Sequence, residues 1–153
     1  MDATTKVLVV DDEEVVRRAY LRILSAIFDK VEAVANGSEA LRAMENESRD
    51  LVLLDVRLPG IDGMQVLKTI KEKWPESEVV MITAYPVVDA AKEAIQLGAY
   101  DYLAKPLDPD EMIRTASGAM MQKRWSLRRD RQGQDGQRKR PLPTDKPAVQ
   151  PDE

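Results

Sequence analysis

The sequence predicts an α/β domain in which a parallel sheet carries helices on both faces, a doubly wound arrangement. Within the first 122 residues, short apolar runs alternate five times with segments whose apolar residues recur at helical spacing. Such runs, without polar alternation, are typical of parallel strands that are buried on both faces. Parallel strands joined by helices have right-handed crossovers, which place helices on both sides. The 153 residues are too few for an eight-fold barrel, which needs about 250.

The first two strand–helix repeats are predicted by apolar spacing and a capping residue. Residues 7–10 form the first expected strand, and residues 13–28 form the first helix. The apolar side chains of that helix fall on one face: Val16, Ala19, Tyr20, Ile23, Leu24 and Ile27. Residues 31–35 form a short second strand. After a turn, Ser38 is the expected N-cap of a helix through Met44.

The third repeat contains the most apolar strand, residues 51–54, which we expect at the centre of the sheet. Its helix covers residues 64–74 and ends before Pro75, because a proline ring does not fit a helix interior. Asp62 and Gly63, just before this helix, are interpreted as an ordinary turn.

The last two repeats follow the same logic. Residues 79–83 form the fourth strand, and a helix at 87–97 ends at Gly98, which suits the C′ position. Residues 100–104 form the fifth strand. The final helix is expected at 109–121, because it begins with a proline that is compatible with a first helical turn.

Composition limits the chemistry that the chain can perform. Apolar residues make up 43% and charged residues 33%, as in ordinary globular domains. Without cysteine or histidine, the chain has no thiolate or imidazole to act as nucleophile, base or metal ligand. No apolar stretch approaches the ~20 residues that span a bilayer, and the N-terminus lacks a secretory signal. A cytoplasmic location is therefore expected.

Charge is distributed unevenly along the chain. Residues 1–122 carry a net charge of −8 and residues 123–153 a net charge of +4, which gives −4 overall. Few large apolar side chains occur in residues 123–153, so this segment is expected to be a disordered basic tail containing Pro and Gln, apart from a frayed extension of the last helix. We expect one domain at residues 1–122, too acidic for direct binding to nucleic acid.

Polar side chains stand at the carboxyl ends of four expected strands: Asp11 and Asp12, Asp55, Thr83 and Lys105. Parallel sheets place their ligand crevice at this edge, so these residues are expected to converge on one pocket. Ordinary explanations exist for each, since Asp is a common N-cap and Lys a common surface residue. Three carboxylates together, however, repel each other unless a cation neutralises them. Ligation by oxygen alone favours a hard ion, and Mg²⁺ fits best.

Short motifs follow one another along residues 5–122: Asp11-Asp12, Asp55, Leu58-Pro59-Gly60 with Asp62-Gly63, Thr83-Ala84 and Lys105-Pro106. In type, order and spacing they resemble those of the receiver domains of two-component response regulators. Around the third and fourth strands, the sequence is especially similar to receivers of the nitrogen-regulation type. The resemblance implies a flavodoxin-like fold, a three-layer sandwich with five βα units and the parallel strand order 2-1-3-4-5.

The resemblance also implies how the acidic residues act. Asp55 is the phosphoacceptor, a nucleophile that takes a phosphoryl group from a sensor histidine kinase or a phosphotransfer protein. Mg²⁺ is the cofactor, and Asp12 and Asp55 bind it. Asp11 binds the ion directly or through water, and the backbone carbonyl of Arg57 is a further ligand.

Other residues are implied to hold and sense the phosphoryl group. Thr83 and the Lys105 ammonium hold its oxygens, and Thr83 with Tyr102 forms the switch that carries the change outward. The protein is then no enzyme for outside substrates, since it catalyses only its own phosphorylation and dephosphorylation. Arg57 and Tyr85, each two residues after a motif residue, are expected to shield the acyl phosphate from water.

The phosphorylated domain is expected to signal to an output domain or partner through the fourth helix, the fifth strand and the fifth helix. A homodimer would use that surface or the first and fifth helices. The chain is either a stand-alone receiver or part of a longer transcriptional regulator whose effector domain lies outside it.

Three other classes of protein remain as alternatives. A metal-dependent phosphatase with an aspartyl nucleophile needs a second Asp two positions later, where this chain has Arg57. A flavodoxin needs a phosphate loop rich in Ser, Thr or Gly, whereas the acidic residues 11–14 would repel the flavin phosphate. A pure scaffold would not bind Mg²⁺.

Overall fold

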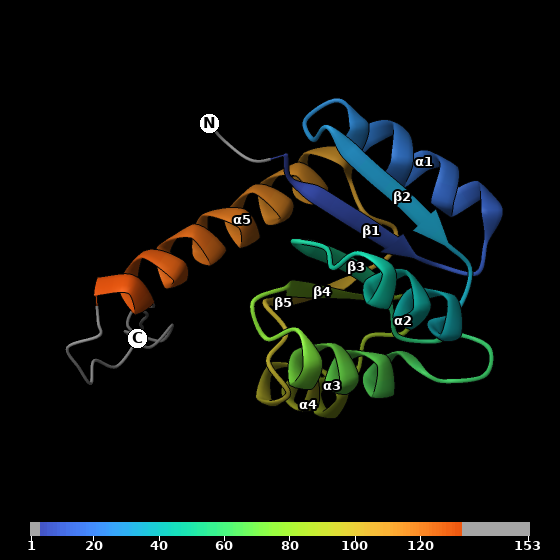
Figure 1. Ribbon diagram of the computed structural model, residues 1–153. Helices are drawn as coiled ribbons and strands as arrows, with labels where there is room; N and C mark the ends of the chain where they lie inside the picture. Colours follow the sequence, from blue (N-terminus) through green and yellow to red (C-terminus); the bar gives the residue numbers. More distant parts are fainter. Residues whose placement is uncertain (1–3, 133–153) are drawn as a thin grey trace, which may run out of the picture. The chain divides into compact units, whose positions relative to one another are not determined.

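The computed structural model describes residues 4–132, which contain one five-stranded parallel sheet. The strand order is β2-β1-β3-β4-β5 (Figure 1), as the resemblance implies. The strands are β1 (Lys6–Val10), β2 (Lys30–Val34), β3 (Leu51–Asp55), β4 (Glu78–Thr83) and β5 (Asp101–Ala104). All five residues of the central strand β3 are buried, in agreement with its apolar sequence.

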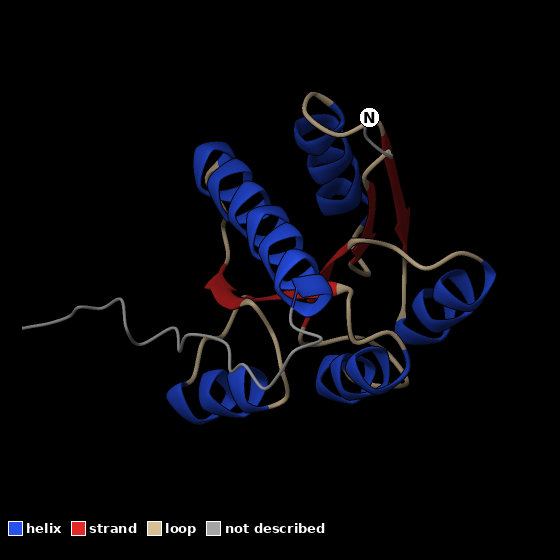
Figure 2. Ribbon diagram, turned by 60° about the vertical axis from the view of Figure 1, so that its left-hand side comes forward, coloured by secondary structure: helices blue, strands red, loops and turns tan. Residues whose placement is uncertain are grey.

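Helices alternate with the strands and lie on both sides of the sheet (Figure 2). They are α1 (Glu14–Ser25), α2 (Gly37–Asn46), α3 (Gly63–Lys73), α4 (Val88–Gln96) and α5 (Pro109–Gln132). One core contains side chains of α1 and α5, and the other contains side chains of α2, α3 and α4. Strand β3 contributes Val52 and Leu54 to the second core and Leu51 and Leu53 to the first, because successive side chains on a strand point to opposite faces.

Two helix starts differ from the sequence-based expectation. Asn36, and not Ser38, caps α2: its Oδ1 accepts a hydrogen bond from the Glu39 N–H at 2.8 Å, and Glu39 Oε1 accepts one from the Ala35 N–H at 2.9 Å. The first bond is the Asn36 half of a capping box, whereas the Glu39 carboxylate accepts from the residue before the cap and not from Asn36 itself. At α3, Asp62 is the N-cap and not an ordinary turn residue, since its Oδ1 accepts from the Gln65 N–H at 3.0 Å.

The last helix is longer than expected, because α5 continues past Met121 to Gln132. Residues 122–132 contain mainly good helix formers and neither Gly nor Pro, which explains the extension. By its contacts the chain divides after Lys123 into two units. Residues 133–153, where we predict disorder, lie outside the described residues, and the domain boundary at 122 stays a prediction. No helix within residues 4–132 is long and apolar enough to cross a membrane.

Ion pairs connect the beginnings of β1 and β2 to the segment that follows α2. The Glu47 carboxylate, just after α2, lies 2.9 Å from Lys6 Nζ and 2.9 Å from Lys30 Nζ. Hydrogen bonds from Lys6 and Lys30 lower the pKa of Glu47 from 4.5 to about 2. A carboxyl with a lowered folded-state pKa stabilises the fold above its unfolded pKa, and this contribution is lost as the pH falls through the folded pKa.

In the Glu47→Gln variant, the free energy of unfolding is therefore expected to fall less steeply as the pH is lowered from 4.5 to about 2. Urea unfolding at several pH values in this window measures the effect. Glu14→Gln is the matched control, because Glu14 belongs to an exposed pair with Arg18, and such pairs contribute little to stability. Equal slopes for Glu47→Gln and the unsubstituted chain would contradict the prediction.

Candidate functional site

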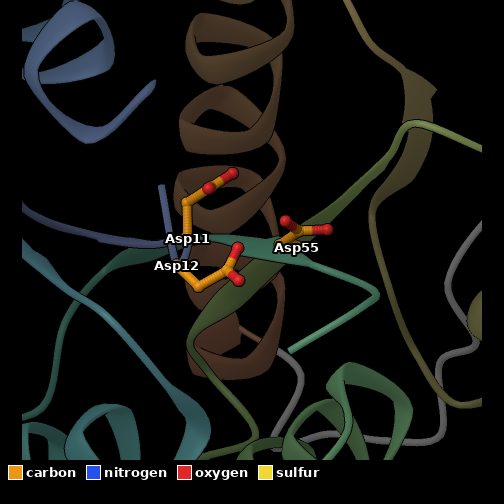
Figure 3. A group of neighbouring side chains, drawn as sticks. All are labelled: Asp11, Asp12 and Asp55. Carbon is orange, nitrogen blue, oxygen red and sulfur yellow. The ribbon is translucent and has the colours of Figure 1, made fainter. Parts of the chain in front are cut away.

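Three carboxylates meet at the carboxyl ends of neighbouring strands (Figure 3). Asp11 and Asp12 follow β1, and Asp55 is the last residue of β3. One oxygen from each lies within 4.8 Å of the others. Asp11 and Asp55 are buried, with 2% and 6% exposure, whereas Asp12 is exposed. The fold thus gathers the acidic residues that the sequence predicts at one point.

Lys105 bridges the two buried carboxylates from the end of β5. Its Nζ lies 2.7 Å from Asp11 Oδ2 and 3.0 Å from Asp55 Oδ2. Each carboxylate uses its other oxygen to accept a backbone hydrogen bond, Asp11 from the Glu13 N–H at 2.9 Å and Asp55 from the Arg57 N–H at 3.1 Å. Both buried anions are therefore compensated, as buried charges must be to remain in a fold.

Burial and the lysine act on the titration of this group in opposite directions. Burial has the largest effect on Asp55 and raises the pKa of its carboxyl, although Lys105 opposes this rise. Burial alone would lower the pKa of Lys105, but its hydrogen bonds to Asp11 and Asp55 outweigh burial and raise that pKa. Desolvation also raises the pKa of the buried Tyr20 to about 12. At neutral pH the lysine is thus an ammonium beside a carboxylate of increased basicity.

Gly63, which the sequence predicts to be an ordinary turn residue, packs against the backbone of the site. A Cβ at this position would lie 2.3 Å from the Asp55 carbonyl oxygen and 2.7 Å from the Val56 Cα. Its N–H also donates to the Val56 carbonyl at 2.9 Å. The first turn of α3 therefore lies directly on the backbone that carries Asp55. Glycine has a low helix propensity, so its presence at the first position of α3 is the sequence signal that could have indicated this close approach.

Arg17 is a second residue that the sequence analysis did not identify. Its Nη1 donates to the backbone carbonyl of Asp11 at 2.8 Å, which fixes the turn between β1 and α1. Because such a contact depends on how a long side chain folds back over a turn, no local sequence pattern predicts it.

Thr83 lies close to the site in the sheet, but its hydroxyl is held elsewhere. The residue is 1% exposed, and its backbone carbonyl accepts a hydrogen bond from the Lys105 N–H at 2.8 Å. Its Oγ1 accepts from the Tyr85 N–H at 3.0 Å. Within residues 4–132 this hydroxyl bonds to neither Asp55 nor Lys105.

Arg57 and Tyr85 connect the loops that follow β3 and β4. The Arg57 Cζ lies 4.7 Å from the centroid of the Tyr85 ring, within the range of a cation–π contact. Tyr85 as a whole is 63% exposed. The contact therefore joins the residue two positions after Asp55 to the residue two positions after Thr83.

Tyr102 lies on β5, the edge strand next to β4. It pairs with Met81 of β4 and packs, partly buried, against the core formed with α2, α3 and α4. It shares no hydrogen bond with Asp55 or Lys105 within residues 4–132. The structure thus brings together Asp11, Asp12, Asp55 and Lys105, and leaves Thr83 and Tyr102 on the adjoining strands.

An open pocket adjoins the acidic residues on the side of the loop after β3. Its volume is about 630 Å³. The lining residues are Asp12, Val56, Arg57, Leu58, Pro59, Asp62 and Met64. Of the three carboxylates, the exposed Asp12 is the one that lines this pocket.

Comparison with known proteins identifies close relatives. The sequence profile of the response regulator receiver domain matches residues 7–117. The DNA-binding transcriptional regulator NtrC of Escherichia coli strain K12 is 41% identical over 107 residues, which are 70% of this chain and 23% of NtrC. The regulatory protein AtoC of the same strain is 37% identical over 112 residues, or 73% of this chain and 24% of AtoC. The chain thus spans about a quarter of the length of these relatives.

Solved structures agree with the sequence matches. A receiver domain protein, described as CheY-like, from Methanospirillum hungatei JF-1 superposes with a TM-score of 0.78 at 25% identity, covering 81% of this chain and 99% of that one. NtrX from Brucella abortus superposes with a TM-score of 0.77 at 34% identity, covering 82% of this chain and 29% of NtrX. With the matching profile, the matching fold and relatives of this identity, the chain belongs to the response regulator receiver domain family.

Proposed function

We propose that Asp55 accepts a phosphoryl group from a sensor histidine kinase or a phosphotransfer protein, and that the chain then changes conformation to signal. One observation carries the proposal: a buried carboxylate of raised pKa lies 3.0 Å from a lysine ammonium and beside two further carboxylates. This is the combination that transfer of a phosphoryl group needs, a nucleophile with cationic groups around it.

The donor set fits Mg²⁺. Three carboxylates with oxygens within 4.8 Å of one another provide the hard ligands that this ion prefers, and one of them is exposed to water. Asp11, Asp12, Asp55 and the Arg57 carbonyl would hold it. When bound, the ion would neutralise the charge that builds up on the phosphoryl oxygens.

The transfer exchanges one bond for another. A carboxylate oxygen of Asp55 attacks the phosphorus in line with the imidazole nitrogen of the donor, so one P–O bond forms while one P–N bond breaks. The leaving imidazole keeps the electron pair and takes a proton from water. Lys105, which now pairs with the Asp55 carboxylate, would balance the charge on the phosphoryl oxygens of the product.

The switch would begin at Thr83, whose hydroxyl would turn to donate a hydrogen bond to a phosphoryl oxygen. Tyr102 would then turn inward, and α4, β5 and α5 would present the change to an output domain or partner. The same surface, or α1 with α5, is the proposed homodimer contact. This is a shift between two populations, so the phosphoryl group must favour the active one by a few kcal/mol.

The reaction would be limited to the chain's own phosphorylation and dephosphorylation. Arg57 stands where an aspartyl phosphatase has its acid–base Asp, so turnover of outside substrates is not proposed. Since the relatives that match are about four times as long and include a regulator named as DNA-binding, an output domain in a longer chain is the proposed target of the signal.

Incubation with a small phosphodonor and Mg²⁺ tests the proposal. The chain is expected to gain the mass of one phosphoryl group, measured by mass spectrometry of the intact protein. Asp55→Asn is expected to abolish this gain, because an amide nitrogen and oxygen are poor nucleophiles. Asp62→Asn is the matched control, since Asp62 is exposed nearby and Asn also caps helices. Phosphorylation of Asp55→Asn, or none of the unsubstituted chain, would contradict the proposal.

A further inference from the structure

Tyr85 is held at two points in the loop that follows β4. Its backbone N–H donates to Thr83 Oγ1 at 3.0 Å, and its ring lies 4.7 Å from the Arg57 Cζ. With 63% of its surface exposed, the ring lacks the enclosure of a core side chain. The guanidinium is therefore a contact that helps to orient the ring.

Thr83 has little freedom apart from its side-chain torsion. Its carbonyl is tied to the Lys105 N–H at 2.8 Å, and the residue is 1% exposed. A β-branched side chain occupies a few distinct rotamers and not a continuum. The hydrogen bond from the Tyr85 N–H favours the rotamer that presents Oγ1 to it.

The Thr83 hydroxyl proton is available in this rotamer. Within residues 4–132, Oγ1 accepts one hydrogen bond and the hydroxyl donates none. Leaving a buried donor without an acceptor is costly, so an acceptor that arrives at Asp55 would draw the hydroxyl towards it. A change of Thr83 rotamer would move Oγ1 away from the Tyr85 N–H, so this hydrogen bond opposes such a change.

We propose that Tyr85 is a positioning residue, which holds Thr83 in the orientation of the unphosphorylated state and is itself steadied by Arg57. The inference rests on the proposed function, since the orientation of Thr83 matters only if Asp55 receives a phosphoryl group. Any residue at position 85 can supply the N–H, except proline. The side chain acts by keeping that N–H in place, because Arg57 restrains the ring and hence the loop.

Beryllofluoride, which mimics a phosphoryl group on a carboxylate, allows a direct measurement in the full chain. At a fixed Mg²⁺ concentration, the midpoint of beryllofluoride binding is read from the backbone amide NMR signals of the residues next to Asp55, which every variant retains. Tyr85→Leu, which removes the π face, is expected to lower the midpoint about two- to fivefold, the effect of an exposed cation–π contact. Tyr85→Phe keeps the ring and is expected to leave the midpoint unchanged.

A purely structural role for Tyr85 would not alter the rotamer of Thr83. In the protein without beryllofluoride, the three-bond couplings of Thr83 are expected to show one rotamer in the unsubstituted chain and in Tyr85→Phe. In Tyr85→Leu they are expected to show averaging. When Thr83→Val removes the hydroxyl, Tyr85→Leu should no longer change the midpoint, because its effect acts through that oxygen.

The outcomes separate this inference from the proposed function. If the unsubstituted chain binds no beryllofluoride, or if Asp55→Asn binds it equally well, the proposed function fails. If Asp55 is required but Tyr85→Leu binds with an unchanged or higher midpoint, only the positioning role of Tyr85 is overturned. Because Tyr85 is exposed, its substitution is expected to leave the fold intact, as an amide correlation spectrum would verify.

Discussion

Replacing Lys105 by methionine is expected to slow phosphoryl transfer to Asp55 by about 100- to 1,000-fold, the usual effect of removing one preorganised group that stabilises transition-state charge. The ammonium lies 2.7 Å from Asp11 and 3.0 Å from Asp55, so it is already in place before the donor arrives. Methionine has a similar length and no charge. The rate is measured from the increase in phosphorylated mass with time at saturating Mg²⁺.

The same substitution should change how stability depends on pH. The folded-state pKa of Asp55 is raised, so the folded chain retains a proton that the unfolded chain loses, and stability falls as the pH rises above the ordinary value of 3.8. Lys105 opposes this rise, and its removal should raise the Asp55 pKa further. The fall in stability is therefore expected to extend to higher pH in Lys105→Met, as urea unfolding in the presence of a chelator would measure.

Lys123→Met is a matched control for both experiments. Its side chain is 15% exposed, close to the 16% of Lys105, and it lies 3.5 Å from Asp50, at the opposite end of β3 from Asp55. Transfer to Asp55 should proceed in this variant at the rate of the unsubstituted chain. Equal rates in Lys105→Met and Lys123→Met would show that the lysine at the site has no part in transfer.

Replacing Gly63 by alanine is expected to destabilise the fold by about 1–3 kcal/mol, the usual cost of overpacking. In a helix interior this substitution normally stabilises, because alanine has the higher helix propensity. Here the added Cβ would meet three backbone atoms of Asp55 and Val56, at 2.3, 2.7 and 2.8 Å. Backbone cannot rotate away as a flexible side chain can, so α3 and the end of β3 must separate. Urea unfolding measures the loss of stability.

The displacement should also impair the site, because the crowded atoms belong to the residue that carries the nucleophile. Phosphorylation of the folded Gly63→Ala protein is expected to be slower than that of the unsubstituted chain. Gly60→Ala is the control: Gly60 has a φ of +79° and no atom within 4 Å of the added Cβ, so it tests backbone strain without crowding. If Gly63→Ala were no less stable than the unsubstituted chain, the close approach would have no energetic consequence.

Much of the fold follows from local pattern. The five apolar runs and the helical spacing between them predict the strands and helices, because such runs are typical of parallel strands. Burial on both faces holds for β1, β3 and β4, whereas the edge strands β2 and β5 are only partly buried. The boundaries at Asn36 and Asp62 were wrong by a residue or two, since a cap is decided by which side chain reaches a free N–H. The helix was expected to end near Met121 with at most a frayed extension, whereas α5 continues to Gln132, because a segment rich in charged helix formers resembles a solvated tail.

The amino-acid sequence alone establishes which chemical groups stand at the strand ends: three carboxylates, a hydroxyl and an amine. Parallel strands bring such groups to one edge whatever their separation along the chain. Only the tertiary structure decided that Lys105 contacts both buried carboxylates, that Gly63 packs on the Asp55 backbone, and that the Thr83 hydroxyl is held by Tyr85. These contacts depend on side-chain rotamers and on atomic positions accurate to a few tenths of an ångström. Packing in the folded chain sets both of these, whereas the spacing of residues in the sequence does not.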